Sequence, residues 1–317
     1  MNGDLTLVAI IVGILHSGVR LATPYLYAAL GETFAQRSGV LNLGVEGIML
    51  VGAIGSFYTV FETGSLLLGV LAALLVGGLM GLLMAVVSVT FEAEQGISGI
   101  GLYLFGLGLS SLAFKTLLGT VEGVNGFSQV RFCIPSTSAC LGNIPIVGEI
   151  LFRHSLMVYG AFLLVPISWY VLQRTTWGLS IRAVGQNPTA ADSLGVSVTR
   201  VRYACVIWGG MMAGMAGASL SISLLNIFQE GLTNGLGFIA VALVYFGSWT
   251  PFGVLLGALL FSTVNALQLW VQVLDLNIPS DVAVMMPYVL TVIALALPFR
   301  RSEAPAALTL PFRRGEN

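Results

Sequence analysis

Apolar stretches of about 20 residues follow one another along almost the whole chain, with short polar connections between them. A helix of this length crosses the ~30 Å hydrocarbon core of a bilayer. Only 9% of the 317 residues are charged, whereas soluble domains carry roughly 25%. The short alternating strands that build a transmembrane barrel do not occur in the sequence. The chain is therefore predicted to be an all-α polytopic membrane protein.

About nine transmembrane segments are expected, some of them discontinuous. Residues 236–248 follow several glycines and end at the turn 247–251, so this helix would be only about 20 Å long. The second span also begins among glycines, which indicates two weakly related halves with a route between broken helices. The expected spans are 5–27, 39–60, 66–90, 97–119, 154–172, 201–226, 236–248, 251–272 and 283–299.

Basic residues orient these spans, because cytoplasmic loops carry an excess of Lys and Arg. Arginines gather in the loop 173–200 and in the tail 301–317, and four predicted spans separate the two regions. Both regions are therefore expected in the cytoplasm, which puts the N-terminus and the loop 120–153 outside. Residues 1–300 would form the transmembrane domain of a multi-pass protein in the inner (plasma) membrane.

The sequence carries no recognisable catalytic pattern. Its two histidines lie far apart, and no HExxH, GxSxG or phosphate-binding loop occurs. The chain is thus predicted to be no enzyme and to hold no metal or cofactor, and its net charge of −1 gives no sign of a nucleic-acid partner. Cys133 and Cys140 fall in the expected outer loop, where a disulfide is possible but not established by their spacing.

Residues 174–202 form the one long polar segment with an ordered pattern. Asn187 can cap a helix that has Pro188 at its first position, where the missing N–H costs nothing. Gly195 is placed to end that helix in a left-handed turn. A short capped helix between two spans can offer a surface to another protein. An ordinary positive loop explains the same residues, and spacing alone favours this second interpretation.

Polar side chains inside the predicted spans are the candidates for a substrate path, because they are costly there. Glu46 either lines such a path or stabilises the N-terminus of a half-helix that Asn42 caps, and the residues favour the structural role. Asn265 and Gln268 share one face of the eighth span. They either bond to neighbouring helices or face a watery cavity.

Four segments of the chain resemble the membrane permeases of ABC importers, within the branched-chain amino acid/simple-sugar permease superfamily. The LNLGVEGIML form is similar to the nucleoside (guanosine-type) permeases, and the match runs in order across nearly the entire chain. The segments are SGVLNLGVEGIMLVGA (38–53), LSIRAVGQNPTAADSLGV (179–196), GLGFIAVALVYFGSWTPFGVLLGALLF (235–261) and NALQLWVQ…IPSDVAVMMPYVLTVIAL (265–295).

This resemblance implies a subunit that transports nucleosides together with other proteins in the lipid bilayer. The partners would be a second permease, a cytoplasmic ATP-binding subunit that hydrolyses ATP, and an extracytoplasmic substrate-binding protein. Family transport paths run between two permeases, so Asn42, Glu46, Asn265 and Gln268 become path candidates. The loop 173–200 would be the element that couples to the ATPase. The matching positions are Arg182, Ala183, Gly185, Asn187, Pro188, Ala190, Ala191 and Gly195.

Other functions stay open at this stage. Within the same superfamily, simple sugars or branched-chain amino acids are rival substrates. An ion-driven secondary transporter is a second class, and it predicts paired carboxylates at mid-membrane, of which the chain offers few. A structural or channel subunit is a third class, without ATP-dependent flux. The residues do not say which nucleoside would be carried, or whether this subunit touches the substrate.

Overall fold

The computed structural model describes residues 7–130, 147–273 and 304–314, with a few positions between 285 and 293, and every regular element in that part is a helix. Three helices continue into π-helical turns, which mark local irregularities of a span. The helices are α1 (Leu7–Arg37), α2 (Val45–Thr63), α3 (Leu66–Ala85), α4 (Gln95–Ala113), α5 (Val147–Phe152), α6 (Leu156–Arg174), α7 (Thr176–Gln186), α8 (Pro188–Ser193), α9 (Val198–Ser219), α10 (Leu236–Phe246) and α11 (Pro251–Val273), and the π-helical turns are η1 (Val86–Thr90), η2 (Phe114–Leu118) and η4 (Leu220–Leu224).

Seven of the helices in the described residues are long and apolar enough to cross a membrane, and α10 is a shorter apolar helix. These eight correspond to the first eight predicted spans, most within a few residues at each end. The ninth, 283–299, falls almost entirely outside the described residues. The total of nine spans and the relation between two halves therefore stay predictions.

The first predicted span is wrong at its end, because α1 continues from residue 27 to Arg37. The residues taken for a polar connection include Glu32, Thr33 and Gln36, and all three are buried. Thr33, Gln36 and one oxygen of Glu32 are hydrogen-bonded inside the protein, so the helix does not need to end where its hydropathy falls.

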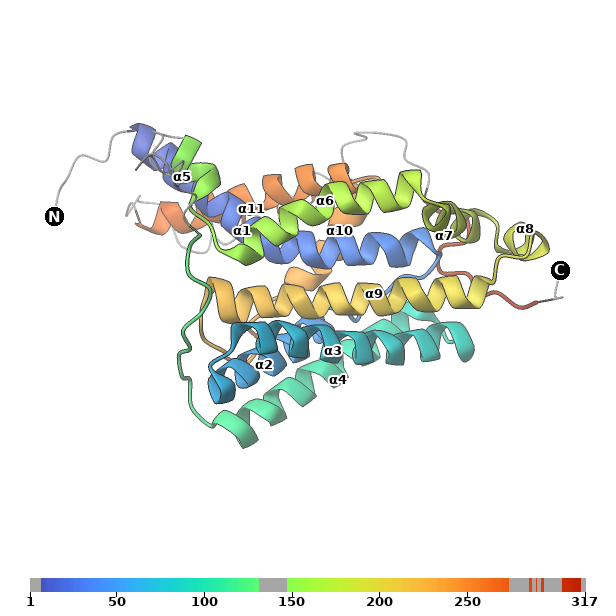
Figure 1. Cartoon of the computed structure of the whole chain (residues 1–317), viewed down its shortest axis with the longest axis horizontal. Coiled ribbons are helices and arrows are strands. Elements are labelled where there is room, and N and C mark those ends of the chain that lie inside the picture. The colour runs from blue at the N-terminus through green and yellow to red at the C-terminus, as the bar shows by residue number, and fades with distance from the viewer. Residues whose placement is uncertain are drawn as a thin grey trace, which may run out of the picture.

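Helix α9 lies at the centre of the bundle, between α1 on one side and α2 and α3 on the other (Figure 1). Small residues let α3 and α9 approach closely. A Cβ atom on Gly77 would overlap the carbonyl oxygen of Gly210, and a Cβ on Gly210 would overlap that of Gly77. Backbones in such contact gain packing energy that does not depend on water, as helix association in lipid requires.

The two ends of the bundle differ in character (Figure 1). The short helices α7 and α8 and the red C-terminal segment gather at one end. Helix α5 and the start of α1 lie at the other end. The end that holds α7 and α8 is called the coupling end below.

Candidate functional site

A discontinuous span crosses the bundle between η4 and α11. Phe228, in its irregular first part, packs on Phe57 and Phe114 with ring centroids 6.4 and 5.6 Å apart, far from the coupling end. At the other extreme, the indole N–H of Trp249 donates to Gln36 Oε1 at 2.8 Å, next to the end of α1. The chain thus passes from one end of the bundle to the other as an irregular lead-in followed by α10. A broken span at this place agrees with the prediction.

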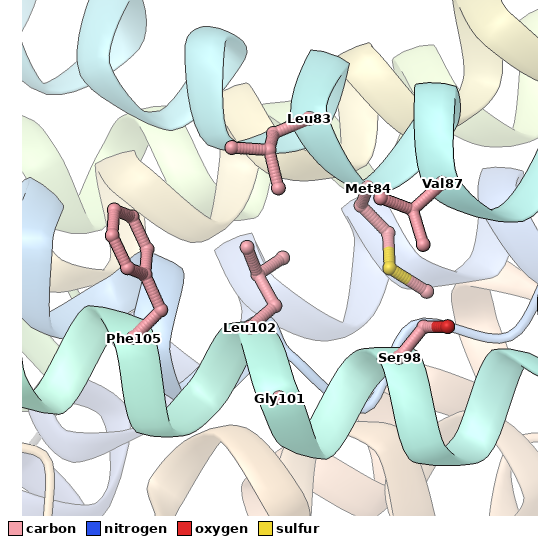
Figure 2. A pocket seen from close by; sticks show the side chains of 7 residues that line it. All are labelled: Leu83, Met84, Val87, Ser98, Gly101, Leu102 and Phe105. Carbon is pink, nitrogen blue, oxygen red and sulfur yellow. The ribbon is translucent and has the colours of Figure 1, made fainter.

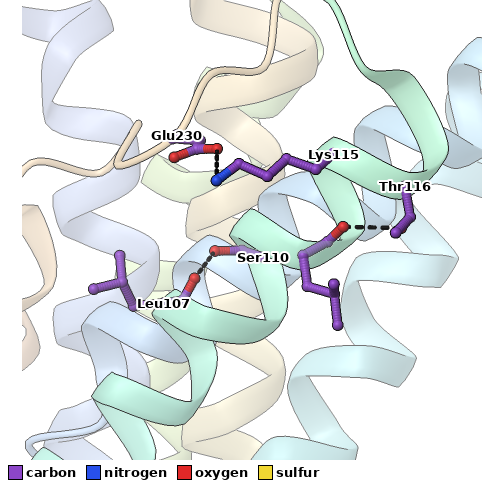
Figure 3. A network of polar contacts seen from close by, with 6 residues as sticks. Leu107, Ser110, Lys115, Thr116 and Glu230 are labelled. Carbon is purple, nitrogen blue, oxygen red and sulfur yellow. Dashed lines mark hydrogen bonds and ion pairs between the residues drawn. The ribbon is translucent and has the colours of Figure 1, made fainter.

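The lead-in to this span is also tied to η2, the turn that follows α4. The Lys115 ammonium lies 3.4 Å from the Glu230 carboxylate, as Figure 3 shows. Both side chains are largely exposed, at 69% and 43%, so the pair contributes at most about 1 kcal/mol. It fixes the direction of the loop more than it stabilises the fold.

The start of α10 is held by the buried carboxylate of Glu46, which lies in the first turn of α2. Its Oε1 accepts from the Thr233 hydroxyl at 2.5 Å and from the N–H of Gly235 at 2.7 Å. Its Oε2 accepts from the N–H of Gly237 at 2.6 Å. The first N–H groups of a helix have no partner within the helix, and an anion there is favoured by the dipole. Glu46 therefore joins the beginning of α2 to the beginning of α10, the helix of the broken span.

This contact requires glycine on the α10 side. A Cβ atom on Gly237 would lie 2.6 Å from the Cα atom of Glu46. Gly235 has φ +84°, a left-handed conformation that glycine adopts without strain. The sequence analysis expected Glu46 near its own helix start; the structure adds the second helix, whose residues lie almost 190 positions further along the chain.

Asn42 is buried beside Glu46 and shapes the irregular segment before α2. Its Oδ1 accepts from the N–H of Gly44 at 2.9 Å, and its own N–H donates to Glu32 Oε1 at 2.9 Å. Gly44, rather than Asn42, occupies the cap position of α2. The expected capping role of Asn42 is thus corrected to a turn that precedes the helix.

Glu32 and Gln36 form a polar network that the sequence analysis missed. The Gln36 amide N–H₂ donates to Glu32 Oε1 at 3.1 Å, and Gln36 Oε1 accepts a hydrogen bond from the Trp249 indole N–H. The network links α1, the segment before α2 and the turn after α10. Its only signal in the sequence is the cluster of polar residues that ends the first predicted span.

Asn265 and Gln268 lie on α11 and are both half-buried. Helix α11 packs mainly on α1, α10 and α6, whereas α2 packs mainly on α9, α3 and α4. The structure therefore does not gather the four path candidates into one site within this subunit.

The polar segment before α9 folds as two short helices, α7 and α8. The side chain of Asn187 accepts from the N–H of Ala190 at 3.0 Å, and Pro188 takes the first helical position. Gly195 has φ +85°, which allows the left-handed turn after the helix. The predicted start and end of α8 are confirmed; α7 was not predicted.

Burial separates the eight predicted coupling residues into three groups. A Cβ atom on Gly185 would overlap the carbonyl oxygen of Arg37, so α7 is pressed against the end of α1. Ala191 is 3% exposed and packs with α7 and α9, whereas Leu194 is 85% exposed. Gly185 and Ala191 are buried; Arg182, Ala183 and Pro188 are half-buried; Asn187, Ala190 and Gly195 are exposed.

Residues 305–314 lie across the coupling end as a strap. The N–H of Ala307 donates to the Gly185 carbonyl at 2.9 Å, and the N–H of Thr309 donates to the Gly39 carbonyl at 3.1 Å. The buried guanidinium of Arg202 donates to the Leu310 carbonyl at 3.0 Å. Two exposed ion pairs follow, Arg313 with Glu92 and Arg314 with Asp192. The strap ties α7, α8, α9 and the α1–α2 connection together.

Deleting residues 304–317 should lower the thermal unfolding midpoint in detergent. The deletion leaves Arg202 without one acceptor, and a lost hydrogen bond to a charged group costs about 1.5–3 kcal/mol. Scanning fluorimetry measures the midpoint, and limited proteolysis should cut residues 187–197 faster. Removal of residues 315–317 alone is the control and should change neither. Equal midpoints for both deletions would show that the strap stabilises nothing.

Other features offer no reaction chemistry. Cys133 and Cys140 lie outside the described residues. The described part of the chain holds no group of three metal-ligating side chains, although His16 and His154 stack with ring centroids 4.5 Å apart. An apolar cavity of about 250 Å³ lies between α3 and α4. Ser98 is the one residue with a side-chain hydroxyl among those that line this cavity (Figure 2).

Comparison with known proteins gives a consistent result. The family model described as "Branched-chain amino acid transport system / permease component" matches residues 14–295. A putative glucose ABC transporter permease protein of Haloferax volcanii, TsgC13, is 43% identical over 267 residues, which cover 83% of this chain and 79% of that relative. No solved structure matches the chain.

Two further relatives are named for nucleosides. The guanosine ABC transporter permease protein NupQ of Bacillus subtilis is 35% identical, over 90% of this chain and 92% of its own. The nucleoside ABC transporter permease protein NupC of Lactococcus lactis is 34% identical over the same shares. These alignments extend across nearly all of each protein.

Proposed function

Since the chain belongs to the branched-chain amino acid transport system permease family, we propose that it is the membrane subunit of an ABC importer that carries nucleosides. The observation that carries the substrate class is the similarity to the two nucleoside permeases, which extends over 92% of each of them. The glucose-type relative is more identical but is covered over 79% of its length. Glucose or a similar sugar is therefore the second candidate.

The importer needs three partners that this chain does not supply. A binding protein delivers the nucleoside to the outer face, and a second permease completes the path between the two membrane subunits. A cytoplasmic ATPase docks on α8 and its two cap residues, where Asn187, Ala190 and Leu194 are exposed. The face of α8 that carries Ala191 rests on the permease itself, so motion of the ATPase would move α7 and α8 together.

A continuous series of contacts would carry this motion to the broken spans. Gly185 of α7 touches the Arg37 carbonyl at the end of α1. The Arg37 guanidinium donates to the Trp249 carbonyl at 2.8 Å, in the turn after α10. At its other end, α10 is held by Glu46. A shift of α7 would therefore change how α2 and α10 meet, as alternating access between inward-open and outward-open states requires.

The four path candidates take different roles in this proposal. Glu46 and Asn42 use their side-chain oxygens on neighbouring backbone N–H groups and the Thr233 hydroxyl, so they position the break and leave substrate contact to other groups. Asn265 and Gln268 are half-buried on α11. They remain candidates for contact with the nucleoside.

Deletion of the gene in its native host tests the substrate class. Uptake of radiolabelled guanosine at micromolar concentration should fall at least tenfold, and a plasmid copy should restore it. Uptake of labelled glucose is measured in the same cells and should not change. If glucose uptake falls and guanosine uptake does not, the sugar candidate replaces the nucleoside.

A further inference from the structure

An apolar groove of about 330 Å³ opens on the outside of the bundle near the coupling end. Its walls come from α1, α6, α7 and α9, and its rim includes Ile167 and Trp177, which are 46% and 60% exposed. The side chains of Ser168 and Cys205 are the polar exceptions apart from the indole N–H groups. Three of the four walls are helices long enough to span a membrane, so the groove faces lipid.

The depth of the groove matches one leaflet of a bilayer. Along α6 it extends from Leu164 to Val171, which is about 10 Å at 1.5 Å per residue. One half of the ~30 Å hydrocarbon core measures about 15 Å. On the α7 side the groove ends at Trp177, and tryptophan favours the level of the lipid headgroups. An acyl chain from the leaflet at the coupling end therefore fits its length and its polarity.

Two arginines stand where the headgroup of that lipid would lie. Arg174 follows Val171 by three residues on α6, and Arg200 precedes Ala204 by four residues on α9. Residues three or four apart share a face of a helix, so each arginine sits one turn beyond a groove residue. Both side chains are exposed, and neither pairs with a carboxylate in the described part of the chain.

The Arg174 guanidinium is also held in place, 5.8 Å from the centre of the Trp169 ring. Two positive charges, each one turn beyond a groove residue, complement a phosphate above an acyl chain. Basic groups between spans at the cytoplasmic side recognise anionic headgroups by this combination. We propose that this groove binds one anionic phospholipid, with an acyl chain between α6 and α9 and its phosphate between Arg174 and Arg200.

Native mass spectrometry of the purified chain tests the proposal independently of transport. The protein is reconstituted in nanodiscs that contain equal amounts of phosphatidylglycerol and phosphatidylcholine, and the lipid retained after release is counted. The wild type should retain one phospholipid, with phosphatidylglycerol preferred at least fivefold. A protein that retains no lipid, or retains both lipids equally, would overturn the proposal.

Substitutions locate the retained lipid. Ile167→Trp fills the rim and should abolish retention, whereas Leu163→Trp, at a 62% exposed position of α6 that does not line the groove, should not. Arg174→Gln with Arg200→Gln should remove the preference for phosphatidylglycerol, and Lys115→Gln, at the opposite end of the spans, is the charge control. Equal retention by both tryptophan variants rules out this site. If instead Ile167→Trp leaves the lipid in place and blocks assembly with a second permease, the groove is a protein interface and the proposal fails.

Discussion

The Glu46→Ala variant is expected to unfold at a much lower temperature than the wild type and to lose uptake. The change leaves the buried Gly237 N–H, the half-buried Gly235 N–H and the buried Thr233 hydroxyl without their acceptor. Hydrogen bonds to a charged group are worth about 1.5–3 kcal/mol each, and a buried donor left without an acceptor costs about 1–3 kcal/mol. The start of α10 would then separate from α2. Scanning fluorimetry in detergent measures the change, and vesicle uptake measures the function.

Two matched variants make this result specific. Glu62 lies on the same helix and is exposed, so Glu62→Ala should unfold at the wild-type temperature. Glu46→Gln keeps one acceptor oxygen but turns an amide N–H₂ toward a backbone donor, so its midpoint should lie between the other two. If Glu46→Ala is as stable as Glu62→Ala, the carboxylate does not hold the break.

The Leu194→Asp variant is expected to fold normally and to lose at least nine-tenths of ATP-driven uptake. Leu194 is 85% exposed at the C-terminal cap of α8, and a side chain that serves as a hot spot of an interface is worth 2 kcal/mol or more, roughly a 30-fold change in affinity. An aspartate there would weaken the contact with the ATPase without touching the permease core. Uptake is measured in the deletion host, and docking by co-purification of the ATPase.

A buried neighbour provides the contrast. Ala191 packs against the permease, so Ala191→Asp should lower the unfolding temperature as well as uptake, because it places a charge in an apolar cluster. Thr63→Asp, at the exposed last residue of α2, should affect neither. Full uptake and normal ATPase recovery with Leu194→Asp would contradict docking on α8.

Local rules explain most of what the sequence predicted correctly. Pro188 after Asn187 and a glycine at 195 specify the beginning and end of α8 through backbone geometry alone. The glycines before residue 236 likewise predicted a broken span, because a short apolar run between turns cannot cross a bilayer. Such signals depend on a few consecutive residues and are visible without knowledge of the fold.

The remaining features depend on partners that are distant in the sequence. Hydropathy predicts a loop at Glu32 and Gln36, although Glu32 Oε1 accepts from the Asn42 N–H and Gln36 accepts from the Trp249 indole within the protein. The role of Glu46 depends on Gly237, which only the fold brings near. The division of the coupling residues into buried and exposed sides depends in the same way on where α1 and α9 lie.

The strap has a consequence for the order in which the protein is made. Gly39, Gly185 and Arg202 are synthesised before their hydrogen-bond partners, which lie in residues 307–310. The surface around α7 and α8 therefore reaches its final form only after every described span has been translated. An ATPase that recognises this surface can bind a finished chain and has no complete site on a nascent one.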